Sequence, residues 1–155
     1  MTESLKGCDP SLSRRVVLAT GNPGKLAEMR AILAGHDLEV VALAELGIAS
    51  PPEDADSFAG NALIKARHAA ARSGLPAIAD DSGIEVDALG GRPGLYSARY
   101  AGEPADDSAN NRKLLSELAG VPDARRGARY RCAMVFVRDA EDPEPVVAEA
   151  EWRGR

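Results

Sequence analysis

The sequence predicts a single α/β domain, and three observations support this fold class. Short apolar runs rich in β-branched residues alternate with longer segments in which apolar residues recur at helical spacing. Turns rich in glycine and proline separate these segments. Near the end of the chain, two strand-like runs follow each other without a helix between them. The length of 155 residues fits one domain, since domains typically contain about 50 to 250 residues.

The first half of the chain is expected to begin with a strand, a loop and a helix. The β-branched run 15–19 predicts a buried strand that enters the tight loop 20–24. Residues 25–34 are predicted to be helical because their apolar residues fall on one face, with Gly35 at the C-cap. A second strand is predicted over 38–43.

The clearest predicted helix covers 57–73, which is dense in alanine. Asp56 or Ser57 is expected to cap its N-terminus, and Gly74 is expected to end it. The loop before this helix, 47–56, is rich in proline and acidic residues.

The second half of the chain is expected to contain one more helix and the remaining strands. The strands are predicted over 76–79, 86–89, 129–137 and 146–152, and the helix over 106–118. The helix is expected to turn Leu114, Leu115 and Leu118 toward the core. The acidic turn 139–145 between the last two strands indicates an antiparallel pair.

Composition and charge exclude several classes of protein. The formal net charge of −5 argues against broad binding to nucleic acids, which requires dense lysine and arginine. Cys8 and Cys132 form no C-x-x-C pair, so neither a disulfide framework nor a zinc knuckle is expected. Residues 1–13 lack the apolar core of a signal peptide, and no apolar run approaches the ~18 residues of a membrane span. We therefore expect a soluble, cytoplasmic protein with a flexible extension over 1–13 and a domain over 14–155.

A first candidate site is the predicted loop between the first strand and the first helix. Free N–H groups, the positive end of the helix dipole and a lysine would suit a phosphate there. The loop is not a Walker A motif, because its glycines are too close together and no Ser or Thr follows the lysine. The alternative is an ordinary turn with a surface lysine. The loop residues are Thr20, Gly21, Asn22, Pro23, Gly24 and Lys25.

A second candidate site lies on the long helix, where four polar residues share one face. These residues are Asn61, Lys65, His68 and Arg72. The alternative is a solvated polar face, which is the preferred interpretation of His68 and Arg72. Lys65 is the better candidate for binding a phosphate.

A third candidate site is acidic. Asp80 and Asp81 follow an apolar strand, and ligands in α/β folds gather at the carboxyl ends of strands. Successive side chains of an extended chain point to opposite sides, so only one aspartate is expected to face the site, and the spacing leaves open which one. Glu53, Asp54 or Asp56 could add a ligand for Mg²⁺, which binds oxygen donors. The alternatives are an acidic turn for the aspartate pair and favourable charge at a helix N-terminus for Asp56.

In this order, the motifs resemble those of the inosine triphosphate pyrophosphatase family, also called RdgB/HAM1-like proteins. The similarity extends over about 16–152. Its specific parts are T-G-N-P-G-K at 20–25, S-F-A-G-N-A at 57–62 followed by K-A at 65–66, A-D-D-S-G at 79–83 and G-G-R-P-G-L-Y-S-A-R-Y at 90–100.

The resemblance implies hydrolysis of ITP, dITP and XTP to the monophosphate and pyrophosphate by a Mg²⁺-dependent homodimer. It implies a long central mixed β-sheet flanked by helices, with two lobes around a nucleotide cleft. By matching positions, 20–25 and Lys65 would hold the triphosphate, and Ser82 would lie beside the substrate. Asp81 would be metal ligand and proton acceptor, and Glu53 a second acidic ligand.

The sequence departs from the family pattern at its end. Family members continue into a segment of the G-F-G-Y-D-P type and a later S-H-R motif, which read the purine base, whereas this sequence ends at Arg155. Two hypotheses follow: a shortened enzyme, or a catalytically idle remnant that binds polyphosphate or a partner chain. A third interpretation, a Maf-like pyrophosphatase, fits the motifs at 20–25 and 80–83 poorly.

Overall fold

The computed structural model describes residues 14–155, so the predicted extension 1–13 lies outside the described residues. The strands are β1 (Arg15–Leu18), β2 (Glu39–Ala42), β3 (Ala77–Val86), β4 (Ala128–Val137) and β5 (Val146–Gly154). The α-helices are α1 (Pro23–Leu33), α2 (Phe58–Ser73) and α3 (Asp107–Glu117), and short 3-10 helices connect them. Within this part of the chain, no helix combines the length and the apolar character needed to cross a membrane.

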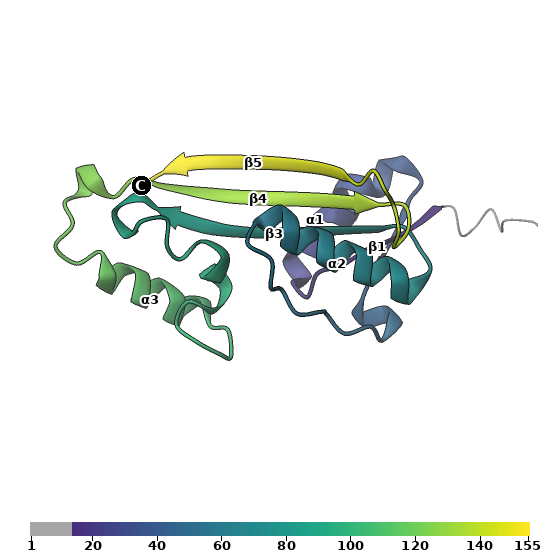
Figure 1. Ribbon diagram of the computed structural model, residues 1–155, viewed down its shortest axis with the longest axis horizontal. Helices are drawn as coiled ribbons and strands as arrows, with labels where there is room; N and C mark the ends of the chain where they lie inside the picture. The colour runs from purple at the N-terminus through teal and green to yellow at the C-terminus, as the bar shows by residue number, and fades with distance from the viewer. Residues whose placement is uncertain (1–13) are drawn as a thin grey trace, which may run out of the picture. The chain divides into compact units, whose positions relative to one another are not determined.

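The strands form one sheet in the order β2-β1-β3-β4-β5 (Figure 1). β1 is parallel to β2, with Val16 opposite Val40. It is also parallel to β3, with Leu18 opposite Ile78. Figure 1 shows β4 running opposite to both β3 and β5, so the sheet is mixed. The predicted α/β class with a mixed sheet flanked by helices is confirmed, as is the antiparallel pair at the end of the chain.

β3 is longer than the sequence pattern predicts. The strand predicted over 76–79 continues to Val86, so the polar motif at 80–83 lies inside the strand and not after it. The strand predicted over 86–89 is wrong, because Asp87–Leu89 form a 3-10 helix that ends at Gly90 with a positive φ of 64°. A polar motif interrupts the apolar run but does not interrupt backbone pairing with a neighbouring strand.

The helix boundaries follow their capping residues. Asn22 caps α1, and Asp106 caps α3 through the N–H of Ala109 at 2.9 Å. The cap predicted at Gly35 is wrong, because α1 ends at Leu33 with Ala34 as its C-cap, and a 3-10 helix follows over Ala34–His36.

α2 begins and ends as predicted. Ser57 Oγ accepts the N–H of Gly60 at 3.0 Å, and Gly74 follows the helix with a φ of 69°. On α3, Leu118 is buried, but Leu115 is 61% exposed, so its predicted core position is wrong.

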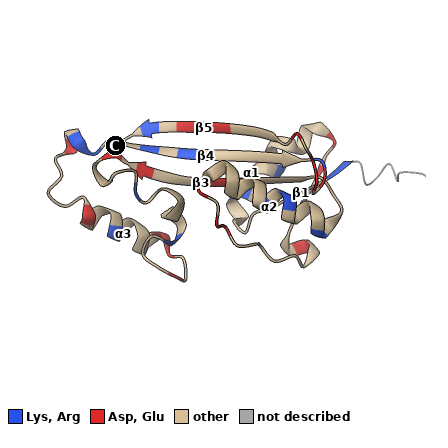
Figure 2. Cartoon of the chain, viewed as in Figure 1, with Lys and Arg blue, Asp and Glu red and all other residues tan. Residues whose placement is uncertain are grey.

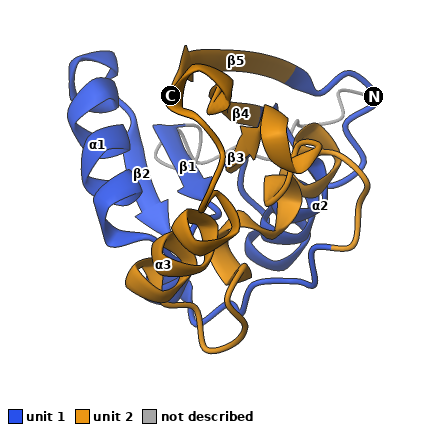
Figure 3. Cartoon of the chain, turned by 90° about the vertical axis from the view of Figure 1, so that its left-hand side faces the viewer, with its two compact units in different colours: residues 1–53, 63–79, 135–146 blue, residues 54–62, 80–134, 147–155 orange. Residues whose placement is uncertain are grey.

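The described chain divides into two compact units, coloured in Figure 3. Unit 1 contains 14–53, 63–79 and 135–146, and unit 2 contains 54–62, 80–134 and 147–155. In unit 1, Val16, Leu18 and Val40 form a core against which α1 packs through Leu26, Met29 and Leu33.

A buried aspartate organises the turn between β4 and β5 in unit 1. Asp142 is 1% exposed, and its carboxylate accepts hydrogen bonds from the guanidinium of Arg138 at 2.6 and 3.0 Å. It also accepts the N–H groups of Arg138 at 2.8 Å and Glu144 at 3.0 Å. Arg67 on α2 donates to the carbonyl oxygen of Asp142 at 3.2 Å, which ties the turn to the helix.

Unit 2 contains a close backbone approach and an exposed strand. A Cβ at Gly83 would overlap the carbonyl oxygen of Gly94 and lie 2.6 Å from Ser97 Oγ, so only glycine fits there. All residues of β5 are exposed, and Trp152 is 83% exposed.

Candidate functional site

The loop between β1 and α1 carries the first predicted site. Asn22 Oδ1 accepts the N–H groups of Gly24 at 2.8 Å and Lys25 at 3.3 Å. The N–H of Asn22 donates to Thr20 Oγ1 at 3.1 Å. The sequence pattern predicts free N–H groups here, but Asn22 engages two of them because asparagine is a strong N-cap residue. An anion would reach the amides of Gly24 and Lys25 only after the Asn22 side chain turned away.

Two other residues shape the backbone of this loop. Pro23 is the first residue of α1, where its missing N–H leaves no hydrogen bond unmade. Gly21 is exposed, and nothing lies within 4 Å of the position that a Cβ would take. Space alone therefore does not require glycine at position 21.

Lys65 on α2 lies beside Glu53, and both residues belong to unit 1. Lys65 Nζ is 3.5 Å from Glu53 Oε1, and the Lys65 side chain is 12% exposed. Charges that are partly buried are screened less by salt than charges at the surface. The structure therefore brings together a residue predicted to bind the triphosphate and a residue predicted to bind the metal.

His68 and Arg72, which share a face of α2 with Lys65, differ in their surroundings. His68 Nε2 is 2.9 Å from the carbonyl oxygen of Ala49, so this nitrogen donates to the loop before the helix. Arg72 is exposed near the end of α2. The exposure of Arg72 agrees with the interpretation as a solvated polar face, whereas His68 is half-buried and bonded to the backbone of the preceding loop.

Asp81 lies within β3 in unit 2, and N–H donors reach both of its carboxylate oxygens. Asn61 Nδ2 donates to Asp81 Oδ2 at 3.0 Å, and the N–H of Ser82 donates to Oδ1 at 3.0 Å. Asn61 in turn accepts the N–H of Ala55 on its Oδ1 at 2.9 Å. The Asp81 carboxylate is thereby held in one orientation.

The neighbours of Asp81 differ in exposure. Asp80 is 6% exposed, whereas Asp81 and Ser82 are half-buried. Alternation along the strand does not account for this difference, because Ser82 belongs to the same side as Asp80 yet is half-buried like Asp81, so which aspartate faces a ligand stays a prediction. Ser82 Oγ lies 3.2 Å from the hydroxyl of Tyr130 on β4.

Sequence reasoning missed two contacts of this site. No sequence pattern marks Tyr130, because its contact with Ser82 joins residues 48 positions apart in the chain. The sequence places Asn61 only among the polar residues on one face of the long helix, because its partner Asp81 is 20 residues away in the chain.

The acidic residues suit Mg²⁺, which takes one or two carboxylates and completes its shell with waters and phosphate oxygens. Among residues 14–155, no three or more His, Cys, Asp or Glu side chains group to enclose a metal ion. Asp81 in unit 2 and Glu53 in unit 1 each offer carboxylate oxygens of the kind that a hard cation prefers.

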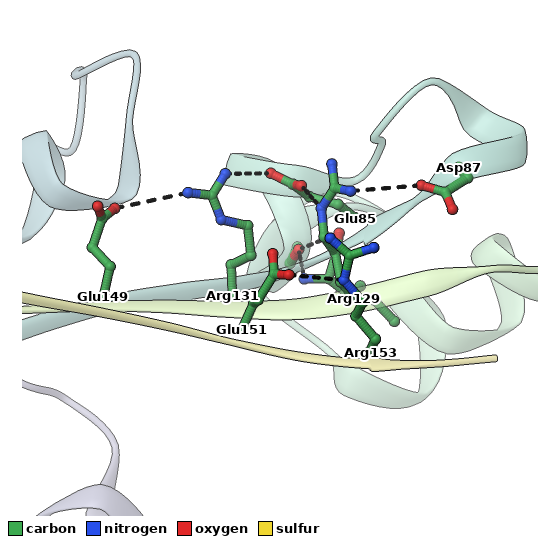
Figure 4. Close-up of polar contacts among 9 residues, drawn as sticks. Glu85, Asp87, Arg129, Arg131, Glu149, Glu151 and Arg153 are labelled. Atoms are coloured by element: carbon green, nitrogen blue, oxygen red, sulfur yellow. Dashed lines mark hydrogen bonds and ion pairs between the residues drawn. The ribbon is translucent and has the colours of Figure 1, made fainter.

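A second group of charges lies across β3, β4 and β5 in unit 2 (Figure 4). Arg129 Nε donates to Glu85 at 2.6 Å, and this carboxylate raises the pKa of Arg129. Arg131 lies 3.5 Å from Glu85 and 3.8 Å from Glu149. Figure 2 shows basic residues on β4 and both acidic and basic residues on β5. Because each arginine faces a carboxylate, this surface is not an anion-binding patch.

Comparison with known proteins identifies the family. The sequence model of the Ham1 family matches residues 16–155. The dITP/XTP pyrophosphatases of Thioalkalivibrio sulfidiphilus and Yersinia pestis are 55% and 56% identical to the chain over 141 residues. Each alignment covers 91% of this chain and 72% of the relative.

Solved structures support the same relationship. A HAM1 protein from Coxiella burnetii is 38% identical with a TM-score of 0.83, over 90% of this chain and 71% of that chain. A dITP/XTP pyrophosphatase from Mycobacterium abscessus is 43% identical with a TM-score of 0.76, over 90% and 73% of the two chains. On the family match, the identities and the shared fold, the chain belongs to the Ham1 family.

Proposed function

We propose that the chain hydrolyses deaminated purine nucleoside triphosphates, such as ITP, dITP and XTP, to the monophosphate and pyrophosphate. The support is the name dITP/XTP pyrophosphatase of relatives that are 55% and 56% identical over 91% of the chain. The structural observation behind the proposal is the Asp81 carboxylate, which two N–H donors hold in place. A fixed carboxylate is suited to orienting a water for attack on phosphorus.

In this proposal the lysines bind the polyphosphate. Lys65 and Lys25 attract the phosphate oxygens, and the loop 20–25 contributes Thr20 and, once the Asn22 side chain turns away, the N–H groups of Gly24 and Lys25. Fixed cations cost little reorganisation when charge develops on the phosphoryl oxygens during the reaction. Ser82 lies next to Asp81 in the chain and donates its hydroxyl to the substrate.

Asp81 and Glu53 are the proposed ligands of Mg²⁺. When bound, the ion would neutralise charge on the phosphate oxygens and lower the pKa of a nearby water. Because Glu53 pairs with Lys65 at 3.5 Å, a cation bound at Glu53 would compete with Lys65 for this carboxylate.

The proposed reaction is a direct displacement without a covalent enzyme intermediate. The water oxygen forms a bond to the α-phosphorus while the bond from this phosphorus to the oxygen bridging to the β-phosphorus breaks. The electron pair of the broken bond leaves with pyrophosphate. Asp81 takes the proton of the attacking water and returns it to solvent.

The idle remnant is the less favoured function, because pyrophosphatases match 91% of the chain at high identity. A cytoplasmic location, expected from the sequence pattern, and a homodimeric state, implied by the family resemblance, complete the proposal. Size-exclusion chromatography with light scattering measures the mass in solution and tests the dimer.

The deciding experiment measures pyrophosphate release with Mg²⁺ from ITP, XTP, GTP and ATP. We expect ITP and XTP to be preferred, and Asp81→Asn to lower the rate about 10²- to 10⁴-fold, the usual contribution of a positioned general base. Asp56→Asn is the matched control, because Asp56 is an exposed acid before α2. Equal rates for wild type and Asp81→Asn, or equal rates for ITP and ATP, would contradict the proposal.

A further inference from the structure

We propose that Asn61 is a positioning residue for the reaction, which sets the orientation of the Asp81 carboxylate. This inference deepens the proposed function and rests on it. Asn61 is 3% exposed in the first turn of α2, and its amide bridges the N–H of Ala55 and the carboxylate of Asp81.

The neighbours of Asn61 determine which way its amide points. The Ala55 N–H can only donate, so the atom facing it at 2.9 Å must be the carbonyl oxygen Oδ1. The amide nitrogen Nδ2 therefore faces Asp81 Oδ2, which accepts at 3.0 Å. Reversing the amide would place donor against donor and acceptor against acceptor, so one orientation is strongly favoured.

The backbone of Asn61 is also fixed. Its N–H donates to the carbonyl oxygen of Ser57 at 3.0 Å, within the first turn of α2. A short side chain on a fixed backbone, buried and bonded at both ends, has little rotational freedom left to lose when a ligand binds. The Asp81 carboxylate that it contacts is therefore preorganised in one orientation.

The same amide stabilises the acidic loop. Ala55 follows Glu53, the other proposed metal ligand, by two positions in the sequence. One side chain thus holds the Asp81 carboxylate and the backbone just after Glu53. Groups that orient metal ligands in this way typically change activity or metal affinity about 10- to 100-fold when they are removed.

The alternative is that Asn61 merely satisfies the partly buried N–H of Ala55. Two substitutions separate these roles. Asn61→Asp keeps an oxygen acceptor for the Ala55 N–H but removes the donor to Asp81, whereas Asn61→Ala removes both contacts. Ser57→Ala is the matched control, since Ser57 Oγ caps the same helix end through Gly60 without contacting Asp81.

The experiment combines kinetics of ITP hydrolysis with amide hydrogen exchange at Ala55. We expect both Asn61 variants to lower kcat about 10- to 100-fold, with a smaller change in KM, and Ser57→Ala to keep the wild-type kcat. Exchange at Ala55 should accelerate in Asn61→Ala but stay slow in Asn61→Asp. If instead kcat fell only in Asn61→Ala, the variant with faster exchange at Ala55, and Asn61→Asp kept the wild-type kcat, the role of Asn61 would be structural. The proposal would then be overturned.

A binding measurement separates this proposal from the proposed function. Mn²⁺ titrated into the protein and followed by electron paramagnetic resonance should bind more weakly to Asn61→Ala than to Ser57→Ala, whether or not any triphosphate is hydrolysed. Equal Mn²⁺ affinity of these two variants, or no Mn²⁺ binding by the wild type, would overturn the positioning role. If the wild type hydrolysed no triphosphate while Asn61→Ala still bound Mn²⁺ more weakly than Ser57→Ala, the proposed function alone would be rejected.

Discussion

Replacing Gly83 by alanine is expected to destabilise the protein strongly, because β3 passes its neighbours closely at this position. The new Cβ would overlap the carbonyl oxygen of Gly94, lie 2.6 Å from Ser97 Oγ and lie 3.1 Å from Phe58 Cε1. A backbone carbonyl cannot swing aside as the end of a long side chain can. The strand or the turn at Gly94 must therefore move.

The size of the effect follows from two contributions. Overpacking in a buried place typically costs about 1–3 kcal/mol. Ser97 Oγ also accepts the N–H of Ile84 at 2.9 Å and donates to Gly94 at 2.6 Å. If the methyl group displaces this hydroxyl, the Ile84 N–H loses its partner at a further cost of about 1–3 kcal/mol. Together these losses of about 2–6 kcal/mol are a large share of the 5–15 kcal/mol of a typical domain.

Urea denaturation followed by circular dichroism measures this loss. Gly35→Ala is the control, because nothing lies within 4 Å of its Cβ position and its φ is not positive. The control is expected to stay within about 1 kcal/mol of wild type. A loss for Gly83→Ala no larger than that of the control would refute the reasoning from close approach.

Two further predictions concern a cation of the proposed site and the acid stability of the fold. Lys65→Met should lower kcat/KM for ITP about 10²- to 10³-fold, the scale for removing one preorganised electrostatic group, and a kcat/KM equal to that of wild type would exclude Lys65 from phosphate binding. Hydrogen bonds from Arg138 lower the pKa of Asp142 in the folded state, so this carboxylate contributes stability above its unfolded pKa of about 3.9 and loses it as pH falls through the folded pKa. Asp142→Asn should therefore be less stable than wild type at neutral pH and should lose less stability than wild type below about pH 4. The urea midpoints of both proteins, measured against pH, test this, and parallel curves would contradict it.

Local signals predicted much of the fold. Apolar periodicity and capping residues located α1 and α2, and Ser57 and Gly74 delimit α2 as expected. The same signals failed in β3, since the polar residues after Ala79 suggest a loop, while pairing in the sheet extends the strand to Val86. They also failed on α3, where the buried residue is Asn110, which bonds the backbone of the preceding segment.

The candidate site shows the same limit. The turn at Asn22 depends on neighbours in the chain, and the sequence predicts its residues well. The pair Ser82 and Tyr130 joins residues 48 positions apart, and only the folded sheet brings them within 3.2 Å. The orientation of the Asn22 side chain also decides which loop N–H groups are already bonded within the protein. No sequence spacing encodes this orientation.

Trp152 has a consequence for spectroscopy. It is the only tryptophan of the chain and is 83% exposed on β5. Its indole is surrounded by water in the native state, so its emission should already be red-shifted and open to quenching by iodide. Unfolding changes these surroundings little, which makes intrinsic tryptophan fluorescence a poor measure of stability for this protein. The same indole is a selective reporter of anything that comes to rest on β5, because covering it would shift the emission to shorter wavelength.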